Sequence, residues 1–375
     1  MRILAIDIGT GTQDILLFDT QREVENCLKM VMPAPTVRVA AAVRAATRRG
    51  SDVVLSGVMM GGGPSAWAVA DHLKAGHRVY ATPAAARTFD DDLERVAAMG
   101  VTLVAEEETH RLREPVVRLR LADFDYADIA AAFARFDVNL EHELDGMAIA
   151  VFDHGNAPRG VSDRLFRFQY LAERVRAENR LSAFAFDIER VPPAMTRMAA
   201  VAASVQRRDL PAVMMDTAPA AVLGALEDPS IRGRRPLLVV NVGNFHCLAF
   251  RLGEAGIEGV FEHHTGELTL PQLDDLLEQL AAGTLSHERV FEGNGHGALL
   301  FQPYAIPPEL RHLAVVGPRR GLLRRSRLSP YFATPFGDMM LAGCYGLIRA
   351  YAEVLPQAAG AVQGALRGGR DLSLW

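Results

Sequence analysis

The chain has 375 residues, of which 49% are hydrophobic and 23% charged, and its formal net charge is −5. This length exceeds what one hydrophobic core usually supports and predicts two domains. The negative charge argues against bulk binding of nucleic acid or of anionic membranes. With neither a long apolar run nor a signal-peptide pattern, we expect a cytoplasmic protein without a membrane segment.

The first predicted element is a hairpin with a polar turn. In ILAIDIGTGTQDILLFD (residues 3–19) an apolar run reaches Asp7, a Gly- and Thr-rich turn follows, and a second apolar run begins after Asp14. Such a turn exposes backbone N–H groups that can bind phosphate oxygens. An acidic residue at the strand end can hold a metal ion. For both Asp7 and Asp14 the alternative is a carboxylate that caps the turn.

The next part of the chain alternates between helix and strand patterns, which is typical of α/β proteins with parallel sheets. Between a strand and a helix, GGGPSA (61–66) has the G-x-G-x-x-A spacing of a dinucleotide-binding loop. The following strand lacks the acidic residue that would bind a ribose, so we favour a loop lining a ligand cleft. A further strand ends at Asp153 and His154, where Asp153 could serve as a general base or cap the next element.

The polar segment EDPSIRGRRP (227–236) predicts a linker, and the apolar-turn-apolar pattern restarts after it. LLVVNVGNFHCLAFRL (237–252) repeats the opening pattern, with Asn241, Gly243 and Asn244 expected to face a ligand and His246 to pack in the strand. Two hairpins that face each other would form a phosphate clamp.

Two segments in the second half are rich in histidine and glycine, FEHHTGEL (261–268) and EGNGHGAL (292–299). Glycines bury no side chain, so we expect Gly295 and His296 to bring backbone close to a ligand, the alternative being a flexible turn. A divalent metal could be held by a group drawn from these segments and the 153–154 turn. That group comprises His263, His264, His296, Asp153 and His154. Adjacent histidines on a strand point to opposite faces, so His263 and His264 can rarely bind one ion.

Five segments of the chain, taken in their sequence order, resemble motifs of the superfamily of actin, sugar kinases and heat-shock chaperone ATPases. IDIGTGTQDILLFD (6–19) matches the first phosphate motif and LLVVNVGNFHCLAF (237–250) the second. LAVVGPRRG (313–321) matches the adenosine motif, and the connecting helices correspond to MMDTAPAAVLGAL (214–226) and GDMMLAGCYGLIRA (337–350). The resemblance implies an α/β fold of two ribonuclease H-like domains with a central cleft. Its domains would span residues 1–226, with a helical insertion, and 227–375.

The resemblance also implies that the cleft binds ATP and Mg²⁺. Asp7 would hold the metal, and the remaining positions would contact the nucleotide: Gly9, Thr10, Gly11, Thr12, Asn241, Gly243, Asn244 and Gly317. Two positions depart from the superfamily pattern. Asn241 replaces an aspartate and cannot neutralise a metal, and Gly317 is followed by Pro318 rather than by a paired glycine. Phosphate binding is therefore better supported than adenine binding.

The implied function is an ATP-dependent phosphotransferase or ATPase that acts on a small molecule, with Asp7 and Asp153 as catalytic residues. One alternative is a slow or non-catalytic nucleotide sensor that signals by domain closure, and another is dinucleotide binding at residues 61–66. We expect neither a nucleic acid nor a membrane as partner.

Several segments, including MGGGP (60–64) and GNGHGAL (293–299), also resemble an uncharacterised family labelled pyruvate formate-lyase activating enzyme. That label implies iron–sulfur radical chemistry, which requires three closely spaced cysteines. Cys27, Cys247 and Cys344 lie far apart in the sequence. The chemistry of the label is therefore not expected here.

Overall fold

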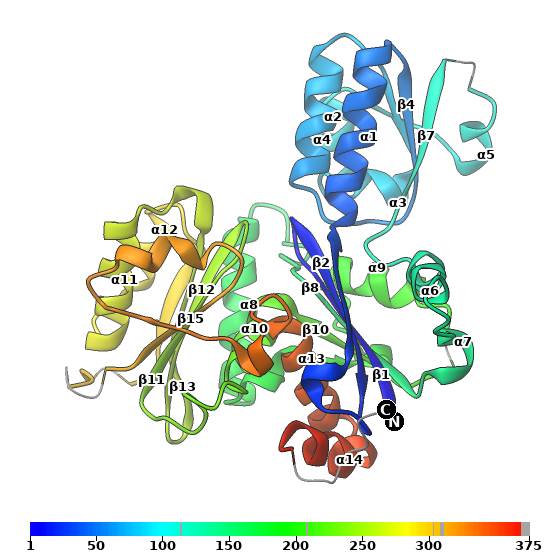
Figure 1. Ribbon diagram of the computed structural model, residues 1–375. Coiled ribbons are helices and arrows are strands. Elements are labelled where there is room, and N and C mark those ends of the chain that lie inside the picture. Colours follow the sequence, from blue (N-terminus) through cyan, green and yellow to red (C-terminus); the bar gives the residue numbers. More distant parts are fainter. Residues whose placement is uncertain (113–114, 208, 303, 308–310, 369–375) are drawn as a thin grey trace.

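Three β-sheets organise the chain in a computed structural model that describes residues 1–112, 115–207, 209–302, 304–307 and 311–368 (Figure 1). The first sheet has the order β3-β2-β1-β8-β10-β9. Its strands are β1 (Arg2–Ile8), β2 (Thr12–Asp19), β3 (Leu28–Pro33), β8 (Gly146–Val151), β9 (Ala185–Asp187) and β10 (Ala212–Asp216). Strands β1, β2 and β3 form an antiparallel meander, and β8 and β10 continue the sheet parallel to β1.

The second sheet has the order β14-β13-β12-β11-β15-β16, in which the five strands from β13 to β16 repeat the order β3-β2-β1-β8-β10 of the first sheet. Its strands are β11 (Leu237–Val242), β12 (His246–Gly253), β13 (Gly256–His264), β14 (Gly297–Leu300), β15 (Leu313–Val316) and β16 (Tyr331–Phe332). Here too the first strand, β11, pairs antiparallel with β12 and parallel with β15. Two sheets of one topology confirm the predicted fold class, two ribonuclease H-like domains of the actin-like ATPase fold.

A third sheet belongs to a unit inserted between β3 and β8, and Figure 1 shows this unit standing apart above the first sheet. Its parallel order is β6-β5-β4-β7. Its strands are β4 (Asp52–Gly57), β5 (Val79–Ala81), β6 (Val101–Leu103) and β7 (Val116–Leu121). Its helices are α1 (Pro35–Arg49), α2 (Pro64–Lys74), α3 (Pro83–Ala86), α4 (Leu93–Ala98) and α5 (Glu106–Thr109). A hydrophobic core of its own supports this unit. The first half therefore carries an α/β insertion in addition to helices.

Helices cover both faces of the two large sheets. The remaining α-helices are α6 (Tyr126–Ala134), α7 (Leu140–Glu143), α8 (Asp163–Ala177), α9 (Thr196–Ser204), α10 (Thr217–Ala225), α11 (Leu270–Ala282), α12 (His287–Phe291), α13 (Ala342–Val354) and α14 (Pro356–Leu366). Short 3-10 segments occupy Val24–Asn26, Leu181–Phe184, Ile188–Arg190, Thr265–Glu267, Arg320–Arg325 and Pro335–Gly337. Among the described residues, no helix is long and apolar enough to cross a membrane.

Helices α10 and α13 form the layer between the two sheets. Helix α13 contacts β1, β2, β8 and β10 of the first sheet, whereas α10 contacts β11, β12 and β15 of the second. One continuous hydrophobic core includes residues from both helices and from both sheets. The C-terminal connecting helix therefore packs on the first sheet, although it follows the second in sequence. The division at residues 226 and 227 remains our proposal.

Glycines allow α10 and α13 to touch backbone to backbone. A Cβ on Gly224 would overlap the carbonyl oxygen of Ala342, and a Cβ on Gly346 would overlap that of Ala220. Neither helix can move away from the other without opening the core between the sheets, because each helix also packs against the strands on its opposite side.

We predict that Gly346→Ala lowers the free energy of unfolding by about 2 kcal/mol, since the added methyl overpacks the helix contact. Gly360→Ala in α14 is the matched control, because nothing lies within 4 Å of its Cβ position. There the same substitution should raise stability by up to about 1 kcal/mol through helix propensity. Urea unfolding of both variants measures the two effects, and equal effects would contradict the close approach.

Candidate functional site

The turns of the two hairpins meet in a cleft between the domains. Backbone hydrogen bonds close both turns in the same way, from the Gly9 N–H to the Thr12 carbonyl and from the Gly243 N–H to the His246 carbonyl, each 2.9 Å long. The turn tips touch, since a Cβ on Gly11 would overlap the side-chain amide of Asn244. The sequence-based expectation that the hairpins face each other is confirmed in the geometry.

A cavity of about 90 Å³ lies under these turns. Most of the residues predicted to contact a nucleotide line it: Asp7, Gly9, Thr10, Thr12, Asn241, Gly243, Asn244 and Gly317. The cavity also borders the N-terminal ends of α10 and α13, at Thr217 and Gly343. Sequence segments from both ends of the chain thus converge on one small polar space.

Asp7 and Asp14 face each other across the first hairpin, as direct partners in the antiparallel register. Thr217 donates a hydrogen bond from its hydroxyl to Asp7, while Oδ1 of Asp14 is buried and has no hydrogen-bond partner among the described residues. Burial raises the pKa of Asp7 to about 7. Burial, reinforced by the charge of Asp7, raises the pKa of Asp14 to about 8.

This carboxylate pair fits a magnesium ion, because an unpartnered carboxylate oxygen beside a second carboxylate is a ligand type that this hard cation prefers. The sequence assigned the metal to Asp7 alone and left Asp14 open. The two residues can act together, since they are opposite each other on adjacent strands.

The second hairpin offers no such charge. Asn241 occupies on β11 the position that Asp7 occupies on β1, because each is the second-to-last residue of its strand. The residue paired with Asn241 on β12 is Leu248. Gly317 lies directly beside Asn241, with φ 103° and a Cβ position that would overlap Oδ1 of Asn241. Both carboxylates that line this cavity, among the described residues, therefore belong to the first domain.

A larger cavity of about 460 Å³ adjoins the first. It lies between the inserted unit, the segment after β8 and the hairpin turns, and the two cavities share Thr10, Phe152, Arg197, Phe245 and His246. Residues 59–63 line it, which confirms the prediction that the glycine loop borders a cleft.

The glycine loop has its donors occupied by protein groups. The N–H of Gly61 donates to both oxygens of Asp123, at 3.1 and 3.0 Å, and Asp123 is in turn paired with Arg197 at 2.7 Å. The N–H of Ser65 donates to the hydroxyl of Thr36 at 3.2 Å. A dinucleotide pyrophosphate would need these N–H groups, so this geometry does not favour the dinucleotide alternative.

Asp153 caps the backbone that follows it. Its two oxygens accept hydrogen bonds from the N–H groups of Gly155 and Met198, each 2.8 Å long. Burial raises its pKa, although both hydrogen bonds and two arginines oppose the shift. Of the two interpretations of Asp153 that the sequence left open, the geometry matches the cap.

Asp91 is a cavity residue that sequence reasoning missed. It lines the larger cavity, and its Oδ1 is buried without a hydrogen-bond partner in the described chain. Burial, with a contribution from the charge of Asp153, raises its pKa to about 6. It stands in the run DDD (90–92), whose sequence does not distinguish the middle aspartate from its neighbours.

Gly295 lines neither of these two cavities, and close packing by its neighbours accounts for a glycine at this position. A Cβ on Gly295 would lie 2.5 Å from Cγ1 of Val290 and 2.6 Å from Cδ2 of His263. The imidazole of His263 is hydrogen-bonded through Nε2 to the Gly293 carbonyl at 2.8 Å and through Nδ1 to the His264 carbonyl at 3.1 Å. His263 therefore holds the glycine turn in place.

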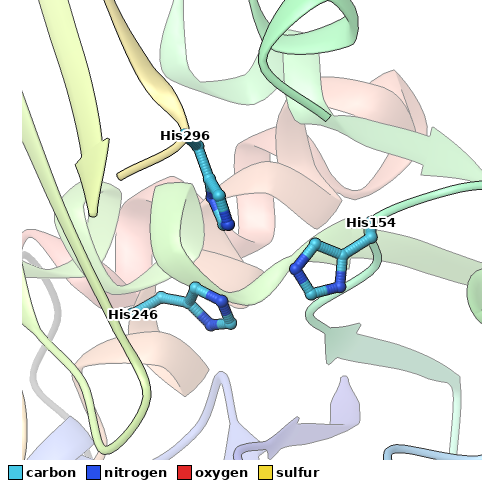
Figure 2. Close-up of side chains that lie close together, drawn as sticks. All are labelled: His154, His246 and His296. Atoms are coloured by element: carbon cyan, nitrogen blue, oxygen red, sulfur yellow. The ribbon is translucent and has the colours of Figure 1, made fainter. Parts of the chain in front are cut away.

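His296 lies beside two other histidines rather than in the smaller cavity (Figure 2). His154 follows β8, His246 begins β12 and His296 precedes β14. The ring of His246 stacks on Phe152 with centroids 3.8 Å apart. Burial lowers the pKa of His154 to about 3 and moves that of His246 well below its ordinary value. Both imidazoles are therefore neutral at physiological pH.

A buried ion pair between Glu262 and Arg167 lies next to this histidine group. Nδ1 of His296 lies 3.4 Å from Oε2 of Glu262, and the same oxygen lies 3.2 Å from Nε of Arg167, which also pairs with Asp216. Burial alone would raise the pKa of Glu262, but the charges of Arg167 and His296 outweigh it and the pKa is lowered. Glu262 is therefore a permanent anion next to His296.

We predict that the metal-free protein loses stability as the pH rises through 7 and 8. Asp7 and Asp14 have folded-state pKa values above their unfolded value of about 3.8. Their contribution is therefore present at low pH and is lost as both ionise. Asp14→Asn should remove about 2–3 kcal/mol of the loss between pH 6 and 9, because the pKa of Asp14 lies about two units above pH 6 and each unit corresponds to about 1.4 kcal/mol.

Urea unfolding at both pH values in EDTA measures this difference. Asp71→Asn, which changes an exposed carboxylate of α2, is the control and should behave like wild type. An unchanged pH dependence in Asp14→Asn would show that Asp14 is already ionised below neutral pH.

Comparison with known proteins places the chain in a family. The family described as "Putative pyruvate format-lyase activating enzyme (DUF1786)" matches residues 60–322. No curated protein matches the sequence. The chain is similar to the solved structure of the ethanolamine utilization protein EutJ from Carboxydothermus hydrogenoformans, with 12% identity and a TM-score of 0.31. That match covers 92% of this chain and 89% of that chain.

An exopolyphosphatase-like protein of known structure is also similar, with 10% identity and a TM-score of 0.29, over 99% of this chain and 91% of that chain. The fold assignment rests on the strand order of the two sheets and not on these superpositions. The cysteines do not meet the requirement of the family's description, because Cys27, Cys247 and Cys344 are free, buried and far apart in sequence. Because the family match spans well over half of the chain, this protein belongs to the family described as "Putative pyruvate format-lyase activating enzyme (DUF1786)".

Proposed function

We propose that the protein binds ATP with Mg²⁺ between its two ribonuclease H-like domains and transfers the terminal phosphoryl group to a small molecule or to water. One observation carries the proposal. Two glycine turns on topologically equivalent strands meet over one cavity, and the first of them brings the carboxylate pair Asp7 and Asp14.

The cleft residues supply positioning and charge, which are the main requirements of phosphoryl transfer. The turn at residues 9–12 presents backbone N–H groups to phosphate oxygens with little side-chain obstruction. Asp7 and Asp14 would hold the cation, and Thr217 orients Asp7 through its hydrogen bond. When bound, Mg²⁺ neutralises the charge of the phosphates. Gly317 and its neighbour Pro318 border the same cavity on the second domain.

The nucleotide requires the turns to separate. Ligand pockets typically measure roughly 300–1,000 Å³, whereas this cavity holds about 90 Å³. The two domains would therefore have to move apart from their arrangement in this structure to admit the nucleotide. The contact between Gly11 and Asn244 is the one that opening would break.

The larger cavity is where we place the phosphoryl acceptor. It adjoins the phosphate turn at Thr10, and its volume of about 460 Å³ is in the usual range for a small-molecule site. Asp91 is our candidate general base in place of Asp153. Its unpartnered oxygen can accept a proton, and a pKa of about 6 suits proton abstraction near neutral pH.

A nucleotide sensor that signals by domain closure is the second candidate. Asn241 favours it, because the second turn lacks the carboxylate that would help to neutralise a metal–phosphate complex. In a sensor, closure of the two turns would be the output, and turnover would be slow or absent.

We predict that ATP with Mg²⁺ stabilises the wild-type protein by about 2.7 kcal/mol when the nucleotide is present at 100 times its Kd. Asp7→Asn keeps the shape of the side chain but removes its charge, so the Mg²⁺-dependent part of this stabilisation should disappear. Thermal unfolding with ATP or ADP, each with and without Mg²⁺, measures it, with Asp71→Asn as the control. No shift with any nucleotide would exclude the clamp.

Asp91→Asn tests the enzyme against the sensor. In an enzyme the variant should retain the nucleotide-induced stabilisation but lose about 10²–10⁴-fold in kcat. ATP turnover is measured with and without a pool of candidate acceptors. Turnover that Asp91→Asn leaves unchanged rules out this base, and nucleotide binding without turnover in the wild type favours the sensor.

A further inference from the structure

Three histidines from distant segments converge where the domains meet. His154 belongs to the first domain, and His246 and His296 to the second. One ring nitrogen of each lies within 4.8 Å of the others, and Figure 2 shows the three rings gathered around a common point. Tetrahedral Zn²⁺–N bonds of about 2.0–2.1 Å would place such nitrogens roughly 3.3 Å apart. Binding of an ion would therefore bring the nitrogens closer to one another by up to about 1.5 Å.

Two nitrogens of this group are buried and have no hydrogen-bond partner among the described residues, Nε2 of His246 and Nε2 of the fully buried His296. Nδ1 of His296 has only its 3.4 Å contact with Glu262. Buried polar groups without partners are rare and unfavourable. The neighbouring His263 shows the contrast, since both of its nitrogens are bonded to backbone carbonyls. Core packing alone therefore does not explain the arrangement.

The surroundings of His296 match those of a metal-binding imidazole. Such a histidine usually donates its other ring N–H to a carboxylate, which fixes the ring and its tautomer. Nδ1 of His296 faces Oε2 of Glu262 at 3.4 Å, and Arg167 holds Glu262 from the other side. This leaves Nε2 of His296 as the ligand atom.

The ligand type separates this group from the carboxylates of the nucleotide cavity. Imidazole nitrogens suit Zn²⁺, Fe²⁺, Ni²⁺ and Cu²⁺, whereas Asp7 and Asp14 suit Mg²⁺. His154 and His246 both line the larger cavity. An ion on the three histidines would therefore have its next coordination position toward that cavity. Three protein ligands with one open position are typical of metal ions that act on a substrate.

We propose that His154, His246 and His296 bind one divalent transition-metal ion, of the Zn²⁺ class, between the two domains, with an open position toward the larger cavity. The ion would tie the domains together, because its ligands come from both. The acceptor in that cavity would then be a molecule with an oxygen or nitrogen donor that can reach the metal. The ion site itself is independent of the nucleotide proposal.

The test uses tag-free, full-length protein stripped with a chelator and titrated with Zn²⁺ or Co²⁺. The wild type should bind one ion per chain by calorimetry, and Co²⁺ should give the visible absorption of a four- or five-coordinate site. His296→Asn and His154→Asn should each lower the affinity at least 100-fold. Glu262→Gln should lower it about 10–100-fold.

Matched variants separate this site from its neighbours. His142→Asn and Asp14→Asn should leave Zn²⁺ affinity unchanged, the first because His142 is an exposed residue of α7 outside the histidine group and the second because it alters only the smaller cavity. His154→Asn alters a less buried residue than His296→Asn and gives an independent test if the latter does not fold.

Three results would overturn the proposal. The first is no Zn²⁺ or Co²⁺ binding by the wild type, and the second is binding that the His154 and His296 variants retain. The third concerns His264, whose ring centroid lies 4.7 Å from that of His296. An equal loss of affinity in His264→Asn would make it a fourth ligand and would contradict the open position.

Discussion

The close approach of α10 and α13 is the constraint on which the cleft depends. Gly224 and Gly346 allow the two helices to touch, and Gly343 at the start of α13 lies against the carboxylate of Asp7. Thr217 at the start of α10 binds the same carboxylate from the other side. Asp7 is therefore held between two helix ends in a water-poor space, which explains why burial dominates its raised pKa.

The two halves of the cleft repeat one topology but differ in chemistry. In the first hairpin Asp7 is paired across the two strands with Asp14, whereas in the second hairpin Asn241 is paired with Leu248. Both carboxylates that line the cavity among the described residues thus come from the first domain, and the hairpin of the second domain contributes amide groups and close backbone contacts. This asymmetry would let the first domain hold the metal while the second closes over the phosphates.

The sequence predicted the cleft well because its signals are local. Each hairpin is a contiguous pattern of apolar run, glycine turn and apolar run. Pairing of the two strands places the turn where the strands end. Asp91 was not assigned from sequence, and of the three histidines the sequence named His154 and His296 as candidate metal ligands but not His246, because these assignments depend on contacts between distant segments. His246 was expected only to pack in its strand, whereas the fold brings it to His154 and His296. The packing of Gly295 against Val290 and His263 was not visible in the sequence, because this crowding arises only after folding.

Hydrogen–deuterium exchange of the two turns, residues 9–12 and 243–246, measures the proposed clamp most directly. If both domains grip the phosphates, ATP with Mg²⁺ should slow exchange in both turns together, and ATP in EDTA should do so far less. Exchange that stays unchanged in both turns, or protection confined to one domain, would contradict a nucleotide clamp between the two domains.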